Sequence, residues 1–167
     1  PLRPFRESSL VIQVLQEALG EWDTRTILVI DDNDSARNFL MDVIRRMKMI
    51  PIGGAHGLEG LQRAKSFPPK DLIIISSDLK DIATAYPINT IKQEYYTQDV
   101  PILITCADAQ KDNAQQQYQS LAQFKGVLPK TTSTIPFLET LVQNTIRKAL
   151  EGKVVNKNRG EEVARRA

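Results

Sequence analysis

The sequence has very few of the residues that build disulfide frameworks and zinc sites. It contains one cysteine, Cys106, and one histidine, His56, among 167 residues. A single cysteine cannot form an internal disulfide, and the two residues together are too few for a zinc cluster. The sequence therefore indicates a reducing compartment, and we expect the protein in the cytoplasm.

Long apolar runs and a large charge excess are also missing. No apolar run approaches the roughly 20 residues that a membrane helix needs, and no segment resembles a signal peptide. The formal charge of +2 comes entirely from residues 151–167, because the first 150 residues carry 17 groups of each sign. We therefore expect no membrane insertion and no nucleic-acid binding by the body of the chain.

Short apolar runs alternate with amphipathic patterns along most of the chain. The runs predict five buried strands, and the one that carries Pro51 is expected near a sheet edge because proline cannot donate to the ladder. Helical spacing predicts a helix after each strand. Two of these helices are predicted to include Tyr95 and, further on, Ala114, Tyr118, Leu121 and Ala122.

This alternation predicts an α/β fold. We expect a five-stranded parallel sheet in a three-layer α/β/α sandwich of flavodoxin-like topology. We expect residues 1–24 to form an extension with one extra helix over residues 8–19, residues 25–150 to form the domain, and residues 151–167 to form a charged, mobile tail. Because the chain starts with Pro1 rather than methionine, we expect it to be part of a longer protein or a processed form.

In parallel sheets, chemistry collects at the carboxyl ends of the strands. Asp31 and Asp32 follow the first predicted strand, and Lys130 follows the fifth. A third carboxylate after the third strand would complete an oxygen cup for Mg²⁺, with the lysine facing a phosphoryl group. The segment "DLIIISSDLKD", residues 71–81, has hydroxyl groups where that carboxylate is expected.

Residues 25–150 resemble a response-regulator receiver domain of two-component signalling. The resemblance rests on "ILVIDDNDSARNFLMDVI", "GAHGLEGL", "PPKDLIII", "VPILITCADA" and "GVLPK", which occur in the family's order and spacing. It implies that Asp31 and Asp32 match the acid pair that holds magnesium, and that Lys130 matches the lysine that engages the phosphoryl group. The position of the phosphorylated aspartate falls on Ser76, which cannot form an acyl phosphate.

The residues that read out phosphorylation in the family are altered as well. Cys106 stands at the position of the switch hydroxyl, with Thr105 one residue earlier and facing the other side of the strand. The switch aromatic, the proline and glycine after the acceptor, and the proline after the lysine match Val127, Lys80, Thr84 and Thr131. The resemblance therefore implies a degenerate receiver, a pseudo-receiver that does not use the phosphorylation switch.

Alternatives remain for each site residue. Asp78 lies two residues beyond Ser76, on the same face, and could act as a displaced acceptor only if the loop folded back by about 6 to 7 Å. Asp31 and Asp32 would bind Mg²⁺ weakly or be vestigial, and Lys130 would form a structural ion pair with one of them. Cys106 is expected to be buried, although a thiol beside Lys130 could have a lowered pKa and a redox role.

We expect a protein-interaction module within a larger regulatory protein, with no enzyme activity and no cofactor beyond weakly bound Mg²⁺. The resemblance implies a partner protein or flanking domain on residues 109–149, with the helix at 8–19 as the other candidate surface; a homodimer is left open. The second hypothesis is a receiver phosphorylated on Asp78. The third hypothesis is a nucleotide- or flavin-binding enzyme. It is disfavoured because the first predicted strand is followed by "DDNDSA" in place of a glycine-rich loop, and these acidic residues would repel a phosphate.

Overall fold

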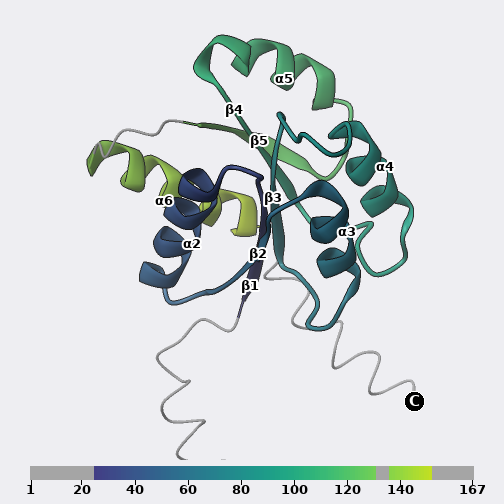
Figure 1. Cartoon of the computed structure of the whole chain (residues 1–167). Coiled ribbons are helices and arrows are strands. Elements are labelled where there is room, and N and C mark those ends of the chain that lie inside the picture. Colours follow the sequence, from purple (N-terminus) through teal and green to yellow (C-terminus); the bar gives the residue numbers. More distant parts are fainter. Residues whose placement is uncertain (1–24, 131–135, 152–167) are drawn as a thin grey trace, which may run out of the picture.

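A sheet of five parallel strands runs through the centre of the molecule (Figure 1). The computed structural model describes residues 25–130 and 136–151, so the helix predicted at 8–19 and nearly all of the charged tail lie outside the described residues. The elements in chain order are β1 (Thr26–Ile30), α2 (Asp34–Arg46), β2 (Ile50–Gly54), α3 (Gly57–Lys65), β3 (Leu72–Ser76), α4 (Ala85–Gln93), β4 (Ile102–Cys106), the 3-10 turn η1 (Asp108–Gln110), α5 (Lys111–Tyr118), β5 (Phe124–Pro129) and α6 (Pro136–Leu150).

The strand order across the sheet is β2-β1-β3-β4-β5. The chain moves outward from β1 to β2, returns to the other side of β1 for β3, and then continues to β5. The strands β1, β3 and β4 are buried along their whole length, which explains their continuous apolar runs. The strand with Pro51 is an edge strand, as its sequence predicts.

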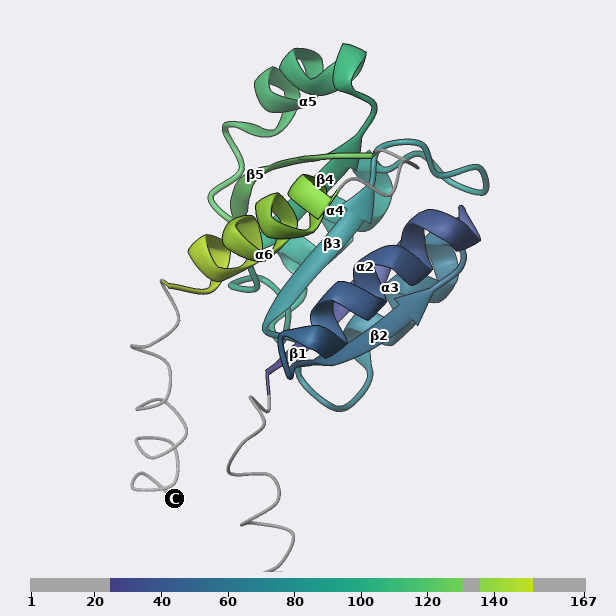
Figure 2. The same cartoon turned by 90° about the vertical axis from the view of Figure 1, so that its left-hand side faces the viewer.

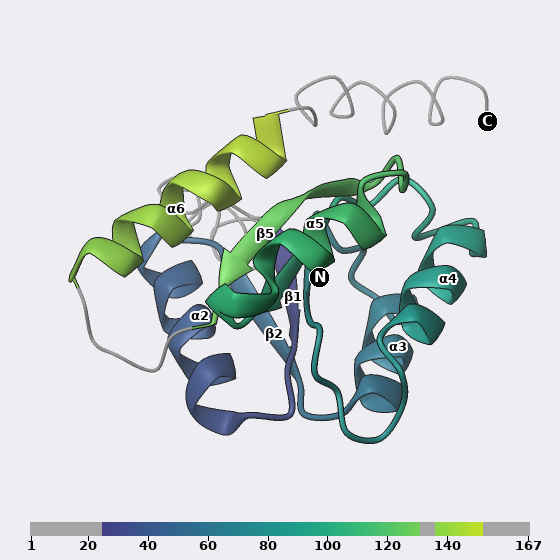
Figure 3. The same cartoon turned by 90° about the horizontal axis from the view of Figure 1, so that it is seen from above.

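Helices cover both faces of the sheet, so the molecule has three layers (Figures 2 and 3). Alternate residues of the central strands point to opposite faces. On one face Val29, Ile74 and Leu103 pack with α2 and α6; on the other Ile30, Ile75 and Ile104 pack with α3, α4 and α5. The predicted flavodoxin-like α/β/α fold is confirmed.

Two helices are shorter than their spacing predicts. The helix α4 ends at Gln93, where the Thr97 hydroxyl donates to the Ile91 carbonyl (2.7 Å), so Tyr95 lies beyond it and is 79% exposed. The helix α5 ends at Tyr118, before Leu121 and Ala122. There the Gln123 amide donates to the carbonyls of Thr97 and Val100 and draws the chain toward the start of β4.

Glycines allow α3 to lie directly on the sheet. A Cβ atom on Gly60 would stand 2.5 Å from the Ile30 side chain, and one on Gly54 would stand 2.8 Å from the Gly60 backbone. Both distances are too short for any other residue. The position of α3, and of the loop that contacts its first turn, therefore depends on these two glycines.

Among the residues that the structure describes, no helix has the length and hydropathy to span a membrane.

Candidate functional site

The polar residues at the carboxyl edge of the sheet are brought together by the parallel register. Asp31 follows β1, Ser76 ends β3 and Lys130 follows β5. Strand alternation places these three side chains on the sheet face covered by α2 and α6, because Val29, Ile74 and Leu128 pack there. The sequence correctly predicts that Asp31 and Lys130, 99 residues apart, meet at this edge.

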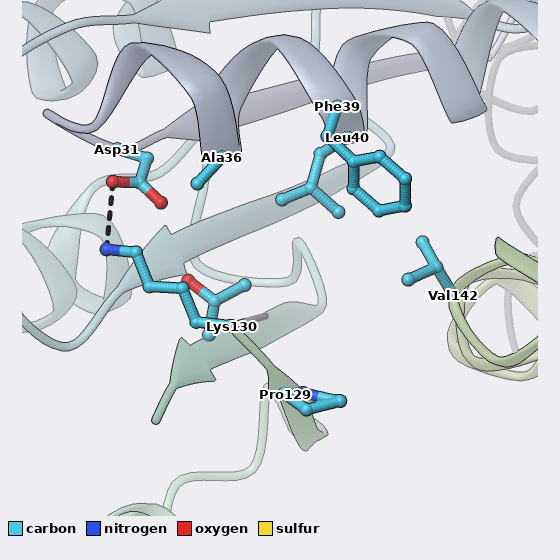
Figure 4. A pocket seen from close by; sticks show the side chains of 8 residues that line it. Asp31, Ala36, Phe39, Leu40, Pro129, Lys130 and Val142 are labelled. Carbon is cyan, nitrogen blue, oxygen red and sulfur yellow. Dashed lines mark hydrogen bonds and ion pairs between the residues drawn. The ribbon is translucent and has the colours of Figure 1, made fainter. Parts of the chain in front are cut away.

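Lys130 is the centre of the arrangement. Its ammonium nitrogen, Nζ, lies 3.0 Å from Asp31 Oδ1 (Figure 4). The same nitrogen donates to Ser76 Oγ at 2.9 Å. The Asp31 side chain is 1% exposed and that of Lys130 15% exposed, while Ser76 is buried. Lys130 thus forms an ion pair with Asp31, one of the two aspartates expected as its partner.

The two adjacent aspartates are used in separate ways. Asp31 Oδ1 also accepts the Asn33 N–H at 2.9 Å, and the Asp31 carbonyl accepts a guanidinium N–H of Arg37 at 2.8 Å. Asp32 instead reaches across to the loop after β3, where its Oδ2 accepts the Lys80 N–H at 2.9 Å. The acid pair therefore connects β1 to its surroundings through hydrogen bonds to protein groups.

The loop after β3 is held by side-chain contacts that the sequence does not predict. The buried Thr84 hydroxyl donates to the Ser76 carbonyl at 2.9 Å. The Asp81 carboxylate accepts the N–H groups of Gly57 (2.9 Å) and Leu58 (3.0 Å) at the start of α3. No local sequence pattern predicts the bonds of Asp81, because its partners lie 24 and 23 residues earlier in the chain.

The contact with α3 also changes the titration of Asp81. The N–H of Leu58 has the largest effect and lowers the pKa of Asp81; burial opposes it, and the N–H of Gly57 lowers the pKa further. The carboxylate compensates the free N–H groups of the first turn of α3, where the helix dipole is positive. Asp81 thus performs the capping role that His56, the residue before α3, does not perform with its side chain.

Asp78, the alternative acceptor, lies exposed just after β3. Its backbone N–H donates to Ser76 Oγ at 3.2 Å, so the turn brings its main chain, and not its carboxylate, to the Lys130 cluster. The negative charge of this carboxylate helps to raise the pKa of the Cys106 thiol.

Cys106 is buried, as expected, and the alternative of a thiol with a lowered pKa is wrong. Burial raises the pKa of the Cys106 thiol, and the negative charges of Asp78 and Asp108 raise it further. The reason is strand alternation: the Cys106 side chain packs with Ile102 and Ile104 on the face opposite to Lys130. Thr105 lies on the same face of the sheet as Lys130. Val127 is partly buried and packs on the same face as Cys106. Thr131 lies outside the described residues.

The described residues do not match the oxygen cup that Mg²⁺ needs. Mg²⁺ takes oxygen ligands, carboxylates and waters, in octahedral geometry, whereas Asp31 Oδ1 already binds the Lys130 ammonium and the Asn33 N–H. The third position is the neutral Ser76 hydroxyl. Within residues 25–130 and 136–151, no three His, Cys, Asp or Glu side chains are grouped so that they could hold a metal ion.

Comparison with known proteins places this arrangement on a familiar fold. No family model and no curated protein sequence matches the chain, but 268 chains of solved structures are similar to it. A chemotaxis response regulator of Vibrio cholerae matches with 19% identity and a TM-score of 0.65 over 77% of this chain and 100% of its own. The receiver domain of a sensor histidine kinase from Pseudomonas aeruginosa, with a magnesium ion in its active-site cleft, matches with 18% identity and a TM-score of 0.63 over 77% of this chain and 98% of its own.

One of the similar solved structures is described as an enzyme. An adenylate cyclase structure from Rhodopirellula baltica matches with 16% identity and a TM-score of 0.64 over 87% of this chain and the whole of its own. At these identities the likeness shows the fold alone. The chain therefore has the receiver fold of response regulators.

Proposed function

We propose that this chain is a pseudo-receiver, a signalling module that binds a partner protein or a flanking domain without being phosphorylated. One observation carries the proposal. The position of the phosphorylated aspartate holds Ser76, whose hydroxyl, together with Asp31, engages the ammonium of Lys130. The edge that would receive a phosphoryl group is closed by protein groups, and a serine hydroxyl cannot form the acyl phosphate of a receiver.

The positions that would read out phosphorylation support the same proposal. In place of a switch hydroxyl stands the Cys106 thiol, buried on the face opposite to Lys130. The loop after β3 is fixed by Thr84 and Asp81, so it has partners that do not depend on a bound phosphoryl group. We infer that the domain rests in one conformation and offers a constant surface, with no need for Mg²⁺.

Incubation with acetyl phosphate and Mg²⁺, followed by intact-mass measurement, tests the proposal. We expect no mass increase in the wild-type chain or in Asp78→Asn. A phosphoryl adduct present in the wild type and absent from Asp78→Asn would contradict the proposal and establish Asp78 as a displaced acceptor. A receiver domain with an intact aspartate, treated in parallel, shows that the phosphodonor is active.

We place the partner surface on α5, β5 and α6, the described part of residues 109–149. The exposed side of α5 is mainly neutral, with Lys111 and Asp112 as its charged residues, and α6 exposes Leu141. Adding negative charge with Lys111→Glu and Gln115→Glu should abolish capture of the partner in a pull-down, whereas Gln62→Glu on α3 should leave capture unchanged. Loss of capture only when residues 1–24 are removed would move the surface to the extension.

A further inference from the structure

A small cavity lies beside the Asp31–Lys130 pair, between the sheet and the layer formed by α2 and α6 (Figure 4). Its volume is about 20 Å³. Three lining residues, Asp31, Thr105 and Lys130, are polar, and the rest of the wall is apolar, from α2, α6 and Pro129. A space of this size can hold a water molecule, which needs about 10 to 15 Å³ and at least two polar partners.

Two buried oxygens in the wall of this cavity lack a hydrogen bond. Among the residues that the structure describes, neither Asp31 Oδ2 nor Thr105 Oγ1 has a protein partner, although Asp31 is 1% exposed and Thr105 3%. Figure 4 shows the second carboxylate oxygen of Asp31 pointing away from Lys130, into this space. Buried polar atoms without partners are rare because they lose their hydration and gain nothing in return.

We propose that this cavity is a binding site for one ordered water molecule that joins Asp31 to Thr105. The water donates one hydrogen bond to Asp31 Oδ2 and a second to Thr105 Oγ1, or accepts the Thr105 O–H. Lys130 has three N–H donors, of which Asp31 Oδ1 and Ser76 Oγ take two, so the third is available to the water oxygen. The site thus supplies up to three partners, the usual number for a buried water.

Charge and composition favour water over other small ligands. A metal cation would meet only two oxygens and would lie next to the Lys130 ammonium, whereas hard cations take about six oxygen ligands. An apolar ligand would leave both oxygens without partners. The inference concerns the inner side of Asp31 and holds whether or not the domain is phosphorylated, so it does not depend on the proposed function.

The bound water completes the use of the Asp31 carboxylate. Its Oδ1 holds Lys130 and the Asn33 N–H, and its Oδ2 holds the water. The same molecule connects β1, through Asp31, with β4, through Thr105, although β3 lies between these strands. With Asp31, Ser76 and Lys130, the polar cluster would then extend across the four neighbouring strands β1, β3, β4 and β5.

Nuclear magnetic resonance of the full chain tests the site directly. The probe is water itself, observed through cross-peaks between the water resonance and the methyl groups of Ala36, Leu40 and Val142 that line the cavity. We expect cross-peaks with the sign of a long-lived bound water in the wild type and in Thr105→Ser, which keeps the hydroxyl. Absence of these cross-peaks from the wild type would overturn the proposal.

The unfolding temperature gives a second test whose sign separates the two cases. Thr105→Val keeps the shape of the side chain and removes the hydroxyl. If the water is bound, this change removes one of its partners and should lower the unfolding temperature by about 3 °C. If the cavity is dry, it removes an unsatisfied buried hydroxyl, so an unchanged or higher unfolding temperature would overturn the proposal.

Two controls complete the experiment. Ser77→Ala removes another buried hydroxyl without a partner among the described residues, but one outside this cavity, so it should leave the methyl-to-water cross-peaks unchanged. The unfolding temperature of the wild type should be the same in sodium, potassium and choline chloride. A specific increase with sodium or potassium would assign the cavity to a cation and overturn the proposal.

Discussion

Lys130 neutralises a carboxylate that is almost completely removed from water. The Asp31 side chain is 1% exposed, and the Lys130 ammonium is its charged partner at 3.0 Å. Removing one member of a buried ion pair leaves the other charge without compensation, which costs more than the pair itself contributes. The stability of the carboxyl edge should therefore depend more on the match between these two residues than on either one alone.

We expect Lys130→Met to lower the free energy of unfolding by about 3 kcal/mol, because Asp31 would remain charged and buried. Adding Asp31→Asn should recover a large part of the loss. Urea unfolding of the two single variants and the double variant measures the coupling. If the two losses were simply additive, the ion pair would have no structural role.

Asp81 caps α3 although it lies 24 residues after Gly57 in the sequence. Its contribution to stability should depend on pH. Its pKa is lowered in the folded protein, chiefly by the Leu58 N–H. A carboxyl group with a lowered folded-state pKa stabilises the native state above its unfolded pKa and loses this contribution as the pH falls through the folded value. The stabilising effect of Asp81 is therefore complete at neutral pH and disappears in acid.

Asp81→Ala should cost about 1 kcal/mol at neutral pH, the usual effect of removing a helix cap, and much less below the folded pKa of Asp81. Asp81→Asn keeps one acceptor oxygen and cannot titrate, so it should be less damaging and should show a weaker acid dependence. Thermal unfolding at several pH values measures both effects. A penalty for Asp81→Ala that does not change with pH would contradict the assignment.

At the level of single elements, the close approach of α3 to the sheet leaves no space at Gly60. Gly60→Ala should lower the free energy of unfolding by about 1 to 3 kcal/mol, because its Cβ would press on Ile30, a buried residue of β1. Gly53→Ala is the matched control, since its Cβ would meet the flexible Met41 side chain at 3.0 Å. Chemical denaturation compares them, and equal losses would contradict this account.

The elements show which parts of the structure are readable from sequence. Continuous apolar runs such as Leu72–Ser76 identify buried strands because both faces of a central parallel strand are covered. Helix ends are harder to predict, because tertiary hydrogen bonds decide them. The hydroxyl of Thr97 and the amide of Gln123 act on α4 and on the start of β4 from outside those elements, and neither residue belongs to a local stop signal.

The candidate site shows the same division. Strand order and register place Asp31, Ser76 and Lys130 at one edge, so their meeting is predictable from the pattern of elements. The face of the sheet on which each neighbouring side chain lies is more easily missed, which is why the alternative of a Cys106 thiol activated by Lys130 is wrong. The partner of Asp81 is not predictable at all, since only the folded loop brings it to α3.

For the whole molecule, the contacts of Lys130 with Asp31 and Ser76 at the carboxyl edge predict that Mg²⁺ does not change the stability of the protein. A ligand stabilises a protein only if it binds the native state more tightly than the unfolded state. We expect the unfolding temperature of the wild type to be the same with and without Mg²⁺. Ser76→Asp places a third carboxylate beside Asp31 and Lys130 and should create a Mg²⁺-dependent increase.

With Mg²⁺ at tenfold its dissociation constant, the stabilisation of Ser76→Asp would be about 1.4 kcal/mol, or roughly 4 °C. Thermal unfolding with Mg²⁺ and, as the control, with matched concentrations of sodium chloride separates binding from ionic strength. A Mg²⁺-dependent increase in the wild type would show that Asp31 and Asp32 hold the ion without a third carboxylate. The proposal of a metal-independent domain would then fail.

The two outer strands of the sheet each contain a proline, at Pro51 in β2 and Pro129 in β5. The neighbouring N–H groups of Ile50 and Lys130 donate inward, to Arg25 and Cys106. Since N–H directions alternate along a strand, both prolines fall where a donor would face outward. Neither border therefore presents a full row of donors to an added strand, and two copies of this chain should associate, if at all, through their helices rather than by building one continuous sheet.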